Sequence, residues 1–200
     1  MSSSDHRLRA TASWNRTSRF WLAWPPTTGA RDRDAAARDD SVALAHLLSA
    51  HAPVTVVAFS ADVVQCSLQM PPGVMTLAVD PGAALLSSQP VWLADGAGNL
   101  LAGIASDSMT GRDLAQAAGV GVVDLPPGWQ GDLIETDGEG TALVLARLAD
   151  GLDGGRDEAE RLLKDKLGIV QVVWLEDPGS GRVPARYLAP GVVAVPGGHD

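Results

Sequence analysis

Cys66 is the residue best suited to covalent chemistry in this sequence, because it is the single cysteine among 200 residues. It lies in a short amphipathic stretch with Val63, Val64 and Leu68. A thiol attacks a substrate only when a neighbouring base or positive charge helps it to form the thiolate. The sequence places no histidine or carboxylate where it would activate Cys66, so we expect a structural thiol.

The sequence contains no pattern typical of a metal site, a nucleotide-binding loop or a serine nucleophile. His46 lies within a predicted helix, His51 at the end of that helix and His199 next to the last residue, and none forms an H-x-x-x-H pair. Zinc needs such clustered ligands, so we expect no metal. The glycine-rich turns lack P-loop and G-x-G-x-x-G form, and no G-x-S-x-G occurs, so we expect no cofactor and no serine nucleophile.

The composition indicates a globular protein that does not bind nucleic acid. Apolar residues make up 46% of the chain, and the formal net charge is −9. Phosphate contacts require a basic surface, which this balance disfavours. No apolar run has the length of a membrane span or the form of a signal peptide, and a lone cysteine suits a reducing compartment. We therefore expect a cytoplasmic protein with no membrane partner.

The hydrophobic pattern predicts an α/β protein. Short apolar runs bounded by glycine, proline or polar residues predict strands, and these cover 19–24, 54–59, 74–79, 120–125 and 169–175. Apolar residues at helical spacing predict helices, and these cover 31–50, 61–69, 110–119 and 155–168. Ser60 is the expected cap of the helix over 61–69.

Two stretches, 91–125 and 133–175, share one pattern. Each begins with two apolar runs around an Asp-Gly turn of D-G-x-G form, continues in a helix that starts Gly-Arg-Asp, and ends in a strand. The repeated unit is therefore ββαβ, which predicts an array or propeller of similar modules. We expect a single domain over 19–200, preceded by a loose segment over 1–18.

The stretch "WQGDLIETDGEGTALV" (129–144) holds the most informative polar residues. Its second half is a tight turn between two apolar runs, whereas its first half has Gln130 where a substrate loop would carry a charge. With four other pieces in the same order, its part "GDLIETDGEGTALV" (131–144) resembles the agmatine deiminase family of the pentein superfamily, which also holds bacterial peptidyl-arginine deiminases. The other pieces are "WLAWP" (21–25), "PVTVV" (53–57), "AERLLKDKLGIVQVVWL" (159–175) and "LAPGVVAV" (188–195).

The resemblance implies a propeller of five ββαβ modules around a central active site, of which this chain corresponds to about three. It therefore implies an incomplete pentein-type propeller. Family members hydrolyse a guanidinium group: a cysteine thiolate attacks the guanidinium carbon, a histidine shuttles protons, and two carboxylates hold the planar cation.

At the matching positions this sequence departs from the family pattern. The first carboxylate lies in W-M-R-D-x-G-P-x-F, and "ALLSSQPVW" (84–92) places Ser87 on that aspartate. The second is the glutamate of E-G-G, which "QGD" replaces with Gln130. The histidine lies in G-H-V-D, which "GRVP" replaces with Arg182. The nucleophilic cysteine, which the family carries near its C-terminus, has no counterpart.

The resemblance with these substitutions implies a pseudoenzyme or an accessory subunit, with no catalytic residues at the degenerate positions Ser87, Gln130 and Arg182. One alternative is an amidinohydrolase of the agmatine or arginine deiminase type that uses non-standard residues or residues supplied in trans. Another is a small-molecule binding module. The candidate ligand-binding residues are Trp24, Trp129, Gln130, Asp132 and Arg182.

An assembly with other chains is also expected. A chain of about three modules leaves two flanks of the ring open, and the strand "GVVAV" (191–195) forms an exposed edge. Exposed strand edges are covered in most proteins, which predicts a homo-oligomer or a complex with another protein.

Overall fold

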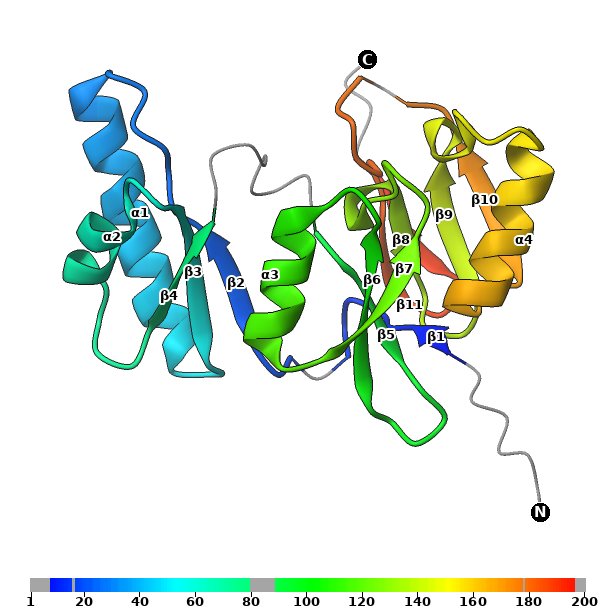
Figure 1. The fold of residues 1–200 in the computed structure, drawn as a ribbon, viewed down its shortest axis with the longest axis horizontal. Coiled ribbons are helices and arrows are strands. Elements are labelled where there is room, and N and C mark those ends of the chain that lie inside the picture. The colour runs from blue at the N-terminus through cyan, green and yellow to red at the C-terminus, as the bar shows by residue number, and fades with distance from the viewer. Residues whose placement is uncertain (1–7, 16, 80–88, 178, 197–200) are drawn as a thin grey trace. The chain divides into compact units, whose positions relative to one another are not determined.

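The computed structural model describes residues 8–15, 17–79, 89–177 and 179–196 (Figure 1). The chain divides into two compact units, one made of Met1–Asn15 with Ser87–Asp200 and the other of Arg16–Leu86. Both units combine helices with strands, so the predicted α/β class is confirmed. Among the described residues, no helix combines the length and apolar character needed to cross a bilayer.

The Arg16–Leu86 unit is a three-stranded parallel sheet with two helices. The chain forms β2 (Phe20–Ala23), α1 (Arg31–Ser49), β3 (Val54–Phe59), α2 (Val63–Gln69) and β4 (Met75–Val79). The strand order is β2-β3-β4, with both neighbouring pairs parallel. Both helices contribute to the core on one side of β3, where Ala45 and Cys66 cluster with Val54, Val56 and Ala58.

The prediction that Ser60 caps α2 was wrong. The residue that precedes α2 is Asp62, and its side chain makes no capping hydrogen bond. The Ser60 hydroxyl instead donates to the carbonyl oxygen of Val79 at 3.2 Å, and its backbone N–H donates to the same oxygen at 3.0 Å. Ser60 therefore ties the end of β3 to the end of β4, a contact that a local pattern cannot reveal.

The other unit contains the predicted repeat. The first module is β5 (Val91–Ala94), β6 (Leu100–Ala105), α3 (Met109–Ala118) and β7 (Gly121–Leu125). The second is β8 (Ile134–Thr136), β9 (Thr141–Leu145), α4 (Gly155–Leu167) and β10 (Gln171–Leu175). In each module the first two strands are antiparallel and the last pairs in parallel with the second. The ββαβ repeat is thus confirmed.

The two hairpin turns close in the same way because each begins with an aspartate. The Asp95 carboxylate accepts the N–H groups of Ala97 and Asn99 at 2.9 and 2.8 Å. The Asp137 carboxylate accepts the N–H groups two and four residues further on at 2.8 and 2.9 Å. Such bonds satisfy backbone donors inside a tight turn, which explains the D-G-x-G pattern.

Three short strands and two 3-10 turns complete this unit. β1 (Arg9–Ala10), which lies in the segment expected to be loose, pairs antiparallel with β5, and β11 (Arg186–Ala189) pairs antiparallel with β12 (Val192–Ala194). The turns are η1 (Gly131–Leu133) and η2 (Ala146–Ala149). The core gathers residues from several of these elements around α4, whose buried positions are Ala159, Leu163 and Leu167.

Gly168, at the end of α4, lies against the backbone of Leu8 and Arg9. Gly119 and Gly168 end α3 and α4 in the same left-handed conformation, with φ of 69° and 68°. A Cβ on Gly119 would meet nothing within 4 Å, whereas one on Gly168 would collide with the carbonyl oxygen of Leu8. We expect Gly119→Ala to lower the free energy of unfolding by about 1 kcal/mol. Gly168→Ala should cost about 1–3 kcal/mol more, measured by urea unfolding. Equal losses would contradict this packing.

Candidate functional site

Three segments far apart in the sequence meet at η1. The backbone N–H of Gly131 donates to the carbonyl oxygen of Gln89 at 2.8 Å, and the carbonyl oxygen of Asp132 accepts the N–H of Val183 at 2.9 Å. A Cβ on Gly131 would lie 2.9 Å from the Pro90 carbonyl oxygen, so only glycine allows this approach. The structure therefore brings Gln130, Asp132 and Arg182 into one region, while Ser87 lies outside the described residues.

Gln130 and Asp132 flank Gly131 with side chains that are partly exposed. Among the described residues, neither side chain makes a hydrogen bond or an ion pair. Burial raises the pKa of the Asp132 carboxyl, and the positive charges of Arg182, Arg186 and Arg147 oppose that rise only in part. Asp132 is thus a half-buried carboxylate that has no ion-pair partner among residues 8–15, 17–79, 89–177 and 179–196.

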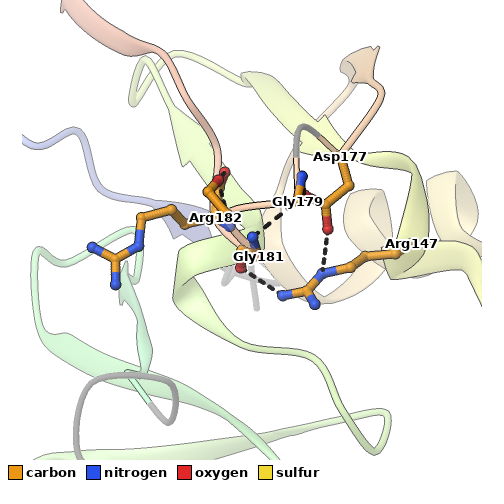
Figure 2. A network of polar contacts seen from close by, with 6 residues as sticks. Arg147, Asp177, Gly179, Gly181 and Arg182 are labelled. Atoms are coloured by element: carbon orange, nitrogen blue, oxygen red, sulfur yellow. Dashed lines mark hydrogen bonds and ion pairs between the residues drawn. The ribbon is translucent and has the colours of Figure 1, made fainter.

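The loop before Arg182 is held by a second group of polar contacts (Figure 2). The Asp177 carboxylate accepts the N–H groups of Gly179 and Gly181 at 2.8 and 3.3 Å. Arg147 donates to the Gly181 carbonyl oxygen at 2.5 Å, and its Nε lies 3.6 Å from Asp177. The exposed side chain of Arg182 points away from Arg147 and Asp177. The contacts therefore order the backbone next to Arg182, and they do not engage its guanidinium.

Glu135 is a polar residue of this region that the sequence did not single out. It is charged, yet it is only 5% exposed in β8. Its carboxylate forms an ion pair with Arg186 and accepts the backbone N–H of Tyr187 at 3.2 Å. A buried carboxylate needs such partners. Glu135 thus connects β8 to β11, and the only sequence signal was an acidic residue inside an apolar run.

Both tryptophans among the candidate ligand residues are buried. Trp24 is 1% exposed and packs in the core of the Arg16–Leu86 unit, and Trp129 is 3% exposed in the core of the other unit. Their role as ligand contacts stays a prediction. Cys66 is also buried, which raises the pKa of its thiol to about 11, with a further contribution from Asp62. Among the described residues, no group of His, Cys, Asp and Glu is placed to hold a metal ion.

The fold built around these segments is that of the agmatine deiminases. The structure is similar to agmatine deiminase of Enterococcus faecalis (19% identity, TM-score 0.75), covering 92% of this chain and 59% of that one. It is also similar to C. jejuni agmatine deiminase (14% identity, TM-score 0.73), covering 94% and 62%. The fold is therefore a pentein fold, and the chain spans less than two thirds of either structure. No curated protein matches the sequence.

Family membership follows from the sequence itself. The profile of the Porphyromonas-type peptidyl-arginine deiminases matches residues 9–183, which is most of the chain. The chain therefore belongs to this family, and the resemblance read from its motifs is confirmed.

Asp132 should make the stability of the fold depend on pH. Since its folded pKa is raised, its ionisation opposes folding above that pKa, and the cost disappears as the pH falls toward the ordinary value of 3.8. We expect Asp132→Asn to increase the free energy of unfolding at pH 7 by on the order of 0.5 kcal/mol, because solvent screens a half-exposed group. The gain should vanish near pH 3.8. Urea titrations across this range, with exposed Asp153→Asn as control, would detect it; a gain independent of pH would contradict it.

Proposed function

We propose that this chain has lost guanidinium hydrolysis and acts as a pseudoenzyme, as an accessory subunit or as a binding module. The observation that carries the proposal is that Gln130 and Arg182 lie on segments joined by the Val183–Asp132 backbone hydrogen bond, at positions where the family pattern has a glutamate and a histidine. We extend the proposal to a cytoplasmic location, supported by the lone cysteine, whose thiol is free and buried.

Electrostatics at η1 disfavour a cation of the guanidinium type. A guanidinium carries only donors, so it binds best to carboxylates that accept two N–H groups in parallel. The Gln130 amide offers one accepting oxygen and a competing NH₂ group. Arg182 adds a positive charge nearby, and its planar fork of donors suits a carboxylate or phosphate. We therefore propose that the site accepts an anionic group at Arg182.

One observation favours the alternative of a working amidinohydrolase. Asp132 stands two residues after Gln130 and has no hydrogen-bond partner among the described residues, so its carboxylate could contact a guanidinium. Three arginines place positive charge near this carboxylate. The two functions are distinguished by turnover and by agmatine binding.

We expect no ammonia release when the purified chain is incubated with agmatine, arginine or a peptidyl-arginine substrate. The physical reason is that no charged acceptor stands at Gln130 to orient the cation. Calorimetric titration with agmatine should likewise show no saturable heat. Sustained ammonia release that survives Cys66→Ala would reveal a different mechanism, and release that this variant abolishes would identify Cys66 as the nucleophile. Either result, or tight agmatine binding, would favour the hydrolase.

We also propose that the chain assembles with itself through β12. Among the described strands β12 pairs only with β11, and its apolar side chains are exposed, with Val192 at 52%. An unpaired strand edge can add a strand from another chain.

Light scattering should therefore give at least twice the chain mass of 20.7 kDa. Val192→Lys should shift the protein toward monomer, because charged side chains on an edge oppose strand pairing. The control is Val170→Lys, which alters a valine outside β12 that is 67% exposed. A monodisperse monomer at micromolar concentration would refute self-assembly.

A further inference from the structure

Two of the three arginines whose charges act on Asp132 already have acidic partners. Arg186 forms an ion pair with the buried carboxylate of Glu135. Arg147 lies 3.6 Å from the carboxylate of Asp177. Each pair is close to neutral, so neither arginine is available as a full positive charge for a ligand.

Arg182 and Asp132 are the charges that remain. They lie on adjoining segments, because Val183 donates its N–H to the Asp132 carbonyl oxygen at 2.9 Å. Among the described residues the side chains of Arg182 and Asp132 form no ion pair with each other or with another group. The Asp132 carboxylate senses the Arg182 charge, which works to lower its pKa without offsetting the effect of burial. One positive and one negative group thus stand near each other, and neither has a partner in the part of the chain that the structure describes.

The contacts of Arg147 help to keep this arrangement. Arg147 binds the carbonyl oxygen of Gly181, and Asp177 binds the N–H of the same residue. The N–H and the carbonyl oxygen of Gly181, the residue before Arg182, are therefore both held. The Arg182 side chain points away from these contacts (Figure 2). A guanidinium whose base is held in this way loses less freedom when it binds a ligand.

We propose that Asp132 and Arg182 together bind a zwitterionic ligand of the α-amino acid class, with Asp132 accepting from its ammonium group and Arg182 donating to its carboxylate. This inference rests on the proposed anion site at Arg182 and adds the requirement for a cationic group. A ligand with only a positive charge leaves Arg182 unpaired. A ligand with only a negative charge leaves the half-buried carboxylate without compensation. A zwitterion pairs both.

The test uses three ligands that share one aliphatic chain. L-Norvaline carries both charged groups, butylamine is norvaline without its carboxylate, and pentanoate is norvaline without its amine. Calorimetric titration of the full chain should show norvaline binding about tenfold or more tightly than either relative, which corresponds to about 1.4 kcal/mol.

Two variants assign each charge to its residue. Arg182→Gln should reduce norvaline affinity to that of butylamine, because the carboxylate loses its partner. Asp132→Asn should reduce norvaline affinity to that of pentanoate, because the ammonium loses its partner. Arg33→Gln, which alters an exposed arginine of α1 in the other unit, is the matched control and should leave all three affinities unchanged. Thermal unfolding of each variant confirms that the fold is retained.

The outcomes separate this inference from the proposed function. If pentanoate binds as tightly as norvaline and only Arg182→Gln weakens it, the zwitterion inference is overturned and the anion site stands. If butylamine or agmatine binds as tightly as norvaline and only Asp132→Asn weakens it, both are overturned. If none of the three ligands gives saturable heat at millimolar concentration, the zwitterion site is likewise refuted.

Discussion

The backbone of residues 130–132 is held between two other segments, and the candidate site depends on this arrangement. Gly131 donates to Gln89 on one side, and Asp132 accepts from Val183 on the other. Both bonds use main-chain atoms, so the side chains at Gln130 and Arg182 can change without loss of either bond. A scaffold built in this way keeps its geometry when the side chains around it differ.

Aspartates organise the turns around this scaffold by one recurring device. Asp95 and Asp137 each bind N–H groups two and four residues further on and so close the hairpins of successive modules. Asp177 makes the same pair of contacts in the loop that follows β10. There it also attracts Arg147, which links the loop to η2. The same local chemistry therefore closes a hairpin in two places and positions Arg182 in the third.

Charge balance gives this region its character. Glu135 is buried and paired with Arg186, so it contributes to the connection between β8 and β11. Asp132 and Arg182 lack such partners among the described residues. The contrast matters because a paired buried charge supports the fold, whereas an unpaired one costs free energy that a ligand can recover. The net charge of −9 describes the whole surface and does not reveal this local balance.

The sequence by itself determined the elements and their repetition, because turn residues and apolar spacing are local signals. The helix predicted over 155–168 is α4 at Gly155–Leu167, and both ββαβ modules have the predicted order. Motif order also identified the family correctly. Tertiary structure decided the rest: the role of Ser60, the pairing of β1 with β5, and the partners of Glu135. It also decided which charges are left unpaired, because that depends on contacts between residues dozens of positions apart, and no local pattern encodes them.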